Sequence, residues 1–167
     1  MNEYTLFRAE KDEFFEFDHQ SPLTDEQQAN FEGLKYFPAN EDLRFEVEIE
    51  PFEEQKEIQM QTTTGDIRDF TRYGLVHFTV GGELAALTVF ANEHGYFIPF
   101  VDTQAGEETY GAGRYLDPEE TEDGKLILDF NLAYNPYCAY NELYSCPLPP
   151  AENRLSVAIK AGEKNFK

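Results

Sequence analysis

The chain has 167 residues, of which 41% are apolar, and its 33 acidic and 13 basic residues give it a net charge of −20. This length fits one domain that buries a core without help from a metal or a disulfide. The charge argues against a nucleic-acid partner, because phosphate binding requires clustered Lys and Arg, and none are clustered here. No apolar run approaches the roughly 20 residues that span a bilayer, so no membrane partner is expected.

The compartment is predicted from the first residues and the cysteines. Six of the first 20 residues are acidic, so this stretch lacks the uncharged core of a signal peptide. Cys138 and Cys146 are too few for a disulfide scaffold. We therefore predict a cytoplasmic protein with reduced thiols, with a Cys138–Cys146 disulfide as the alternative.

Residues 1–38 are predicted to be mainly helical. The spacing of apolar residues between positions 6 and 17 is that of an amphipathic helix. Thr24 is suited to cap a second helix, and Gln27 completes the capping box. Gly33 is expected to end this helix. Both helices are interpreted as covers over a sheet.

From residue 43 onward, apolar and polar residues alternate as in strands. The predicted strands are residues 43–49, 56–62, 73–80, 83–90, 96–101, 125–130 and 155–159. Gly81-Gly82 is the best hairpin signal, because two glycines can supply the positive φ angles of a primed turn. The pattern predicts one domain, 1–167, with a mainly β (α+β) fold. We expect an antiparallel β-sandwich or small barrel over 43–167, with the N-terminal helices packed on it.

The acidic coat is interrupted in the second half of the chain. Residues 1–57 hold 17 acidic and 5 basic side chains, whereas residues 126–160 hold three acidic and two basic ones. Within the latter stretch lies a segment rich in Tyr, Asn and Pro, residues 131–153, in which four prolines disfavour helix and strand. Such long loops are uncommon in compact domains and often functional. We interpret loop 131–153 as a plug that closes one end of the β domain, as the wall of a ligand pocket, or as both, since the two interpretations are not exclusive.

Several short segments from about residue 20 onward match a known family. They include Ser21-Pro22-Leu23, Pro99-Phe100-Val101-Asp102, Gly113-Arg114-Tyr115-Leu116, Asp129-Phe130-Asn131, Ala133-Tyr134-Asn135-Pro136-Tyr137-Cys138-Ala139-Tyr140, Cys146-Pro147-Leu148-Pro149-Pro150 and Glu152-Asn153-Arg154-Leu155. Together they are specific, and the chain resembles the bacterial and archaeal family known as domain of unknown function 1684. The resemblance implies a family without a named activity, and it assigns no catalytic residue.

Candidate ligand-binding residues come from loop 131–153 and from the segments before it. They are Asp102, Arg114, Tyr115, Asp129, Asn131, Tyr134, Asn135 and Cys138. Arg114 follows Gly113 and is suited to grip a carboxylate or phosphate through two parallel hydrogen bonds. The alternative is an ion pair of Arg114 with Asp102 or Asp129 that holds strands together.

Three residues are candidates for catalysis. Asp102 and Asp129 both end predicted strands, where burial would raise the pKa of one carboxyl and leave the other ionised. Cys138 is a candidate nucleophile only if a base such as His77 or His94 lies beside it.

Other known chemistries lack their sequence signals. The chain has no GxGxxG motif, no P-loop and no GxSxG elbow, and its Cys and His residues lack zinc spacing. No cofactor and no metal are therefore predicted. The acidic residues 117–124 lack the spacing of a calcium loop and are interpreted as a solvated hairpin tip.

Three functional hypotheses follow from the sequence. The first is binding of a small polar or anionic metabolite in a pocket at one end of the β domain. The second is a hydrolase or lyase that uses Asp102 or Asp129 as acid and base. The third is a structural or interaction module in which loop 131–153 is a plug.

The excess of carboxylates is also interpreted as adaptation to a salty cytoplasm, with plain surface solubility as the alternative. Repulsion among these charges destabilises the fold in dilute buffer, and salt screens it. We therefore expect the melting temperature to rise with added KCl in a thermal unfolding series. A melting temperature that does not change with KCl would contradict the adaptation to salt.

Overall fold

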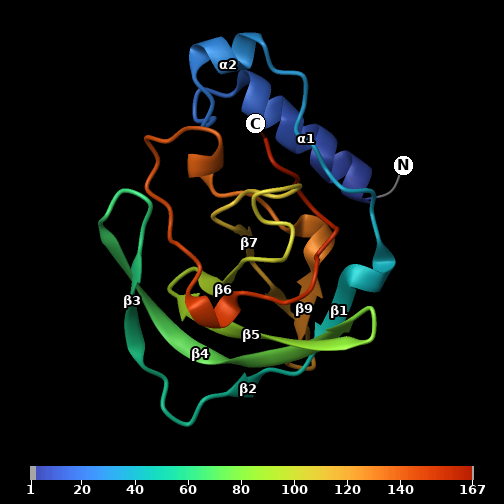
Figure 1. Ribbon diagram of the computed structural model, residues 1–167, viewed down its shortest axis with the longest axis vertical. Helices are drawn as coiled ribbons and strands as arrows, with labels where there is room; N and C mark the ends of the chain where they lie inside the picture. Colours follow the sequence, from blue (N-terminus) through green and yellow to red (C-terminus); the bar gives the residue numbers. More distant parts are fainter. Residues whose placement is uncertain (1–2, 167) are drawn as a thin grey trace.

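The computed structural model describes residues 3–166, with two helices at one end of a β domain (Figure 1). Helix α1 is Glu3–Phe17 and helix α2 is Asp25–Ala29. Within the described residues the strands are β1 (Arg44–Val47), β2 (Glu50–Pro51), β3 (Glu57–Gln61), β4 (Ile67–Val80), β5 (Glu83–Asn92), β6 (Gly95–Phe100), β7 (Arg114–Leu116), β8 (Glu119–Glu120) and β9 (Leu126–Asp129). No helix among residues 3–166 is long and apolar enough to cross a membrane.

The strands form two antiparallel sheets, which confirms the mainly β prediction. The larger sheet has the order β2-β4-β5-β6-β7, with β3 also paired to β4, and the smaller sheet has the order β1-β9-β8. Neither order returns to its first strand, so the sheets stay open and do not close into a barrel. The main core joins residues of both sheets, such as Val76 and Leu87 of the larger and Leu126 and Leu128 of the smaller, all with no exposed surface. Packing of this kind is that of a sandwich.

The hairpin predicted at Gly81-Gly82 is confirmed. Val80 of β4 pairs with Glu83 of β5, and the two glycines between them have φ angles of 57° and 87°. Both angles lie in the region that a primed turn requires and that side chains with a Cβ disfavour.

The capping box is also confirmed, but the helix it begins is shorter than predicted. Thr24 accepts from the backbone of Gln27, and the Gln27 side chain accepts from the backbone of Thr24. The helix ends at Ala29 rather than at Gly33. Phe31 then packs against Phe15 of α1, with ring centroids 6.4 Å apart, so the chain leaves the helix axis to bury this ring.

The strand predicted over residues 155–159 is wrong. Leu155, Val157 and Ile159 are buried as predicted, yet only a single bridge, from Val101 to Arg154, forms beside them. The backbone of this segment instead bonds residues just after β6: the amide of Leu155 donates to the carbonyl of Val101 (2.7 Å), and the amide of Ile159 donates to a carboxylate side chain.

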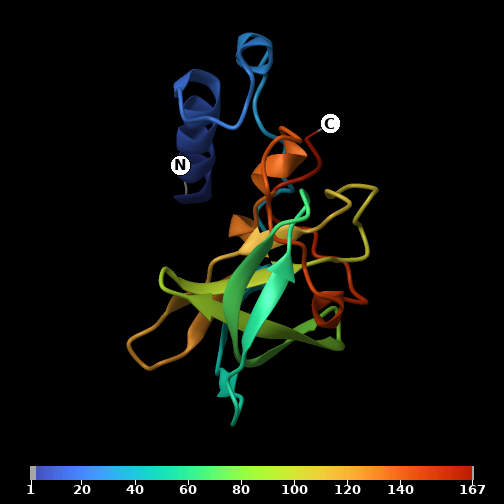
Figure 2. The same cartoon turned by 90° about the vertical axis from the view of Figure 1, so that its left-hand side faces the viewer.

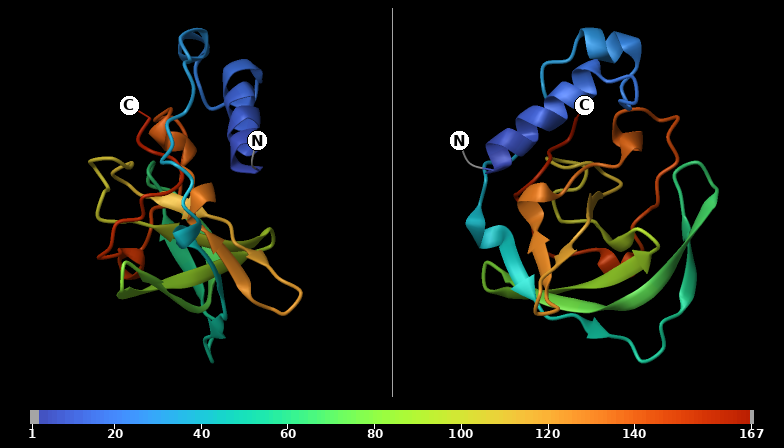
Figure 3. Two further views of the ribbon diagram at one scale, coloured as in Figure 1. Left: turned by 90° about the vertical axis from the view of Figure 1, so that its right-hand side faces the viewer. Right: turned by 180° about the vertical axis from the view of Figure 1, so that it is seen from behind.

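The helices cover one end of the β domain rather than a face of a sheet (Figures 2 and 3). Phe15 of α1 is 1% exposed and meets the ring of Tyr140, in loop 131–153, at 4.9 Å between centroids. Phe166 completes this contact from the C-terminal segment, with its ring 5.0 Å from that of Tyr140. The first turn of α1 reaches the smaller sheet, where the Tyr4 hydroxyl donates to Asp129 at the end of β9 (2.5 Å).

Candidate functional site

Arg114 and Asp102 form an ion pair inside the protein, as in the second of the two interpretations of Arg114. Both side chains are 1% exposed, and Nη2 of Arg114 lies 3.6 Å from Oδ2 of Asp102. Asp102 also accepts from the backbone amide of Ile159 (2.8 Å) and from the hydroxyl of Thr109 (3.0 Å). Both oxygens of this carboxylate are therefore already engaged.

The guanidinium of Arg114 also holds the C-terminal segment. It donates to the backbone carbonyls of Ile159 (2.8 Å), Ala161 (2.5 Å) and Glu163 (3.1 Å). Burial lowers the pKa of Arg114 to about 10, and the charges of Asp102 and Glu163 oppose this shift. Arg114 is still charged at neutral pH, and it acts as a clamp between β7 and residues 159–163.

Asp129 belongs to a separate network near the first turn of α1. Its Oδ1 accepts from the backbone amide (3.1 Å) and the side-chain amide (2.9 Å) of Asn131. Asn131 in turn exchanges two hydrogen bonds with the backbone of Asn40, at 2.8 and 2.9 Å. Arg44 lies 3.9 Å from the other oxygen of Asp129. Asp102 and Asp129, the two carboxylates considered as an acid and base pair, therefore belong to two separate hydrogen-bond networks.

A cavity of about 650 Å³, the aromatic pocket, is lined by residues of β4, the β5–β6 turn, β6, β7 and loop 131–153. Its aromatic residues are Phe70, Tyr96, Phe97, Tyr115, Tyr134, Tyr137 and Tyr144. Arg68 and His94 supply basic groups, and Asp117 supplies a carboxylate. A volume of this size and a lining of rings with a few polar groups are typical of small-molecule sites.

The rings on the floor of the aromatic pocket hold one another in place. Phe97 stacks on Phe70 with centroids 5.2 Å apart, and it meets the edge of Tyr115 at 4.7 Å. Tyr115 in turn meets the edge of Tyr134 at 5.7 Å, and its hydroxyl donates to the carbonyl of Pro147. Edge-to-face contacts of this kind fix ring orientation before any ligand arrives.

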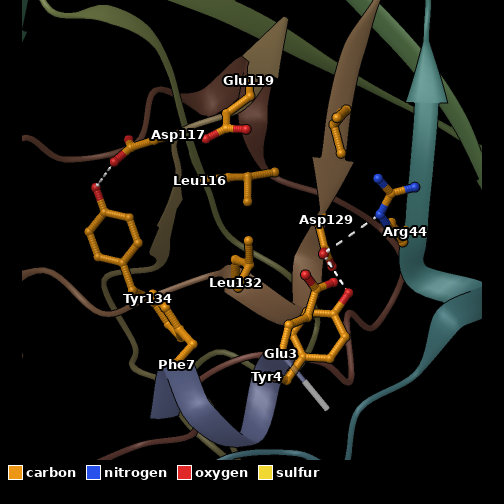
Figure 4. Close-up of a pocket in the computed structure, with 11 residues that line it drawn as sticks. Glu3, Tyr4, Phe7, Arg44, Leu116, Asp117, Glu119, Asp129, Leu132 and Tyr134 are labelled. Carbon is orange, nitrogen blue, oxygen red and sulfur yellow. Dashed lines mark hydrogen bonds and ion pairs between the residues drawn. The ribbon is translucent and has the colours of Figure 1, made fainter. Parts of the chain in front are cut away.

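A second cavity of about 500 Å³, the acidic pocket, lies beside the first turns of α1 (Figure 4). Its polar lining comprises the four carboxylates of Glu3, Asp117, Glu119 and Asp129 and the guanidinium of Arg44, besides the hydroxyls of Tyr4 and Tyr134. Tyr134 donates to Asp117 at 2.7 Å, and these two residues line both cavities. Partial burial raises the pKa of Asp117, while the hydrogen bond from Tyr134 opposes the shift.

Cys138 and Cys146 are free thiols, and both are buried. The backbone amide of Cys138 donates to the sulfur of Cys146 at 3.3 Å. The Cys138 sulfur also lies 3.7 Å from the hydroxyl of Tyr110. Hydrogen bonding, chiefly from Cys146, lowers the pKa of Cys138 to about 6. Cys146 lines the aromatic pocket.

The structure separates the eight residues predicted to bind a ligand. Tyr115 and Tyr134 line the aromatic pocket, and Asp129 and Tyr134 line the acidic pocket. The other five are buried, and they border neither cavity: Asp102, Arg114, Asn131, Asn135 and Cys138.

Several lining residues are absent from the prediction made from the sequence. Asp117 is assigned there to a solvated hairpin tip, yet it lies between the two cavities and is bonded to Tyr134. Arg68 and Phe70 lie at the start of the long strand β4, well before loop 131–153 in the chain. The sequence held a signal for Asp117, because it directly follows the apolar pair Tyr115-Leu116, which the structure places in the buried strand β7.

Comparison with known proteins agrees with the family suggested by the sequence segments. The model of a family described as "Protein of unknown function (DUF1684)" matches residues 29–164, and the chain belongs to that family. The chain is also similar to an uncharacterised protein from Haloarcula marismortui, whose structure was solved in solution by NMR. The two are 38% identical, with a TM-score of 0.71, over 96% of this chain and 91% of the other. No curated protein matches the chain.

Replacing Arg114 with Met tests the clamp. The variant leaves Asp102 buried without an opposing charge, and it should lower the free energy of unfolding by about 3–5 kcal/mol in urea denaturation. Arg44→Met is the control: Arg44 is 41% exposed and pairs loosely with Asp129, so its loss should cost less than about 1 kcal/mol. Equal effects of the two substitutions would contradict the clamp.

Replacing Asp117 with Asn tests its burial. The folded protein holds the Asp117 proton more tightly than the unfolded chain, because the folded pKa is raised above the usual 3.8. The stability due to this group is therefore complete below 3.8 and is lost as the pH rises through the folded pKa. Over this pH range the wild type should lose stability while the Asn variant, which has no carboxyl to titrate, should not. The free energy of unfolding of the variant minus that of wild type, measured by urea denaturation at each pH, should therefore increase with pH. In Tyr134→Phe, which lacks the opposing hydrogen bond, the pKa of Asp117 is raised further, so the loss of stability with rising pH should extend to higher pH. A difference that is constant with pH would refute the assignment.

Proposed function

We propose that this member of the family binds a small amphipathic metabolite, with a planar or ring-shaped body and an anionic group, in the aromatic pocket. The observation that supports this most is the lining of the cavity by seven aromatic residues together with Arg68 and His94. Aromatic rings bind planar or ring-shaped bodies over large areas at low entropic cost, and a guanidinium binds carboxylates and phosphates.

The charges around the two cavities favour the aromatic pocket for an anionic group. The chain carries a net charge of −20, yet this pocket has one guanidinium, one imidazole and one carboxylate in its lining. The acidic pocket has four carboxylates and one guanidinium, and that guanidinium already pairs with Asp129. An anion is therefore repelled from the acidic pocket and is drawn to Arg68.

The orientation of Arg68 and the shape of the pocket are supported by contacts with loop 131–153. Arg68 donates from Nη2 to the carbonyl of Ser145 at 2.8 Å. The amide of Thr63 donates to the carbonyl of Cys146 (3.0 Å), and the amide of Leu148 donates to that of Gln61 (2.8 Å). These bonds join the loop to the β3–β4 hairpin, and a pocket that is already formed loses less entropy on binding.

The other two hypotheses draw less support from the same contacts. Asp102 is bonded to Arg114, Thr109 and a backbone amide, which leaves it poorly suited to act as an acid or a base. Asp129 borders the acidic pocket, so it is the carboxylate through which a hydrolase or lyase reaction would have to proceed. The plug is compatible with binding, because residues of loop 131–153 both cover the β domain and line the pocket.

Binding can be measured with anilinonaphthalene sulfonate, an aromatic anion whose fluorescence rises when it is bound. Arg68→Ala should raise the dissociation constant of this probe about 10-fold or more, since a hydrogen bond to a charged group contributes about 1.5–3 kcal/mol. Arg72→Ala is the matched control, because Arg72 lies on the same strand, pairs with Glu152 and borders neither cavity. Equal affinities in the two variants would argue against the proposal.

The aromatic wall is tested in the same assay. Tyr144→Ala should weaken binding of the probe by about 2–10-fold, because an aromatic contact contributes about 0.5–1.5 kcal/mol. Leu143→Ala is the control, since Leu143 precedes Tyr144 in the chain, is 88% exposed and does not line the pocket. Candidate metabolites can then be ranked by displacement of the probe, and a failure of every ring-bearing anion to displace it would count against a metabolite site.

A further inference from the structure

The two cysteines of loop 131–153 are brought together by a short 3-10 helix, Tyr137–Ala139. Although they are eight positions apart, the backbone amide of Cys138 donates to the sulfur of Cys146 at 3.3 Å, and both side chains pack in one buried cluster with Tyr115. Both are free, with exposed fractions of 5% and 6%. Two thiols in contact are the geometric requirement for an intramolecular disulfide.

The surroundings make the two thiols different. The Cys138 sulfur lies 3.7 Å from the hydroxyl of Tyr110, whereas the Cys146 sulfur accepts from the backbone amide of Cys138. Such donors stabilise a thiolate, and the pKa of Cys138 falls to about 6 while that of Cys146 is raised. Cys138, beside the Tyr110 hydroxyl, is therefore the better suited of the two to attack an oxidant, and Cys146 lies next to it as the resolving thiol.

Access to the pair runs through the aromatic pocket. Cys146 lines that pocket, whereas Cys138 lies just behind it. A small oxidant can enter a cavity of about 650 Å³, but a protein thiol–disulfide partner cannot reach sulfurs that are this deeply buried. The geometry therefore selects peroxides over redox proteins as the co-reactant.

We propose that Cys138 and Cys146 form a peroxide-responsive redox couple that closes to an intramolecular disulfide. The Cys138 thiolate attacks one peroxide oxygen, the O–O bond breaks, and hydroxide leaves, which gives a sulfenic acid on Cys138. The Cys146 sulfur then attacks the Cys138 sulfur, the S–S bond forms, and hydroxide leaves. The proton lost by Cys146 and one from solvent convert the two hydroxides to water. Two thiol sulfurs lose two electrons in total, one hydrogen peroxide gains them, and a thiol reductant restores the couple.

The disulfide also bears on the pocket, and this part rests on the proposed function. It ties Tyr137–Ala139 to the segment that bonds the β3–β4 hairpin, and so closes a ring of chain that contains Tyr144. Tyr137 and Tyr144 meet edge to face at 5.3 Å and both line the aromatic pocket. Oxidation therefore fixes one wall of the pocket and changes its affinity for ligand.

The first test uses the full chain with hydrogen peroxide near neutral pH. We expect the loss of both titratable thiols and of two hydrogen atoms in the intact mass, reversed by dithiothreitol. The oxidised protein should melt at a higher temperature than the reduced protein, because the cross-link restricts the unfolded chain. Separate oxygen additions on the two sulfurs, with no disulfide, would overturn the couple, and this measurement needs no variant.

Variants assign the roles. Cys146→Ser should stop at a sulfenic acid on Cys138, which dimedone traps, whereas Cys138→Ser should react far more slowly. Tyr110→Phe keeps both thiols but removes one donor to Cys138, and a pKa rise of about one unit would slow oxidation about 5-fold at about pH 6. Tyr73→Phe is the matched control, because Tyr73 lies on β4, is half-buried and borders neither cavity, and it should oxidise at the wild-type rate. Equal rates for the two Phe variants would overturn the role given to Tyr110.

Binding of anilinonaphthalene sulfonate to the reduced and the disulfide forms separates the two proposals. Affinities that differ at least about 3-fold would support redox control of the pocket. Equal affinities would overturn that control while the couple itself stands. A probe that binds neither form would contradict the proposed function, whereas absence of the disulfide would contradict the couple whatever the probe does.

Discussion

The charge of Arg114 is buried in the middle of a protein whose surface is strongly acidic, and much of the architecture depends on how that charge is satisfied. Burying an unpaired cation is costly, and here Asp102 and the carbonyls of Ile159, Ala161 and Glu163 compensate it. These carbonyls belong to a segment that forms an isolated bridge, from Glu163 to Tyr36, and is not part of a named strand. The guanidinium thereby satisfies backbone carbonyls of residues 159–163, which the amides of a neighbouring strand would satisfy in a sheet.

Residues 159–163 also connect helix α1 to loop 131–153. The carboxylate of Glu163, which is 1% exposed, accepts from Lys11 of α1 and from the Tyr140 hydroxyl of loop 131–153. Gly162 has φ of 78°, and a Cβ there would lie 2.6 Å from the carbonyl of Ala133. The C-terminal segment is therefore pressed against the loop, and the helix is attached to both. The loop that lines the aromatic pocket is held from behind by a polar core.

Loop 131–153 both packs against the β domain and lines a cavity. One part, which includes Asn153 with no exposed surface, bonds the backbone of Thr88 and Pro99 and closes the β domain. Another part presents Tyr134, Tyr137 and Tyr144 to a cavity. A rigid attachment on one side and aromatic rings on the other is an arrangement suited to binding, since the rings need no further ordering.

The sequence by itself determined the features that depend on neighbours along the chain. The capping box at Thr24 and the hairpin at Gly81-Gly82 follow from local spacing, because each reflects the geometry of a single turn or hairpin. The alternating burial of residues 155–159 also follows from local spacing, although this segment forms no strand. The interrupted acidic coat also located the segment that holds polar side chains away from water, such as those of Asn131, Asn135 and Asn153.

Only the tertiary structure decided which groups those side chains meet. Arg114 bonds carbonyls more than 40 residues away, and Arg68 and Tyr144 line one cavity from distant parts of the chain. Asp117 accepts a hydrogen bond from Tyr134 because strand β7, which ends just before Asp117, lies beside loop 131–153, and no periodic pattern encodes this contact. Periodicity reports which face of an element is buried, whereas a site depends on the three-dimensional convergence of several elements, and that convergence leaves no local trace in the sequence.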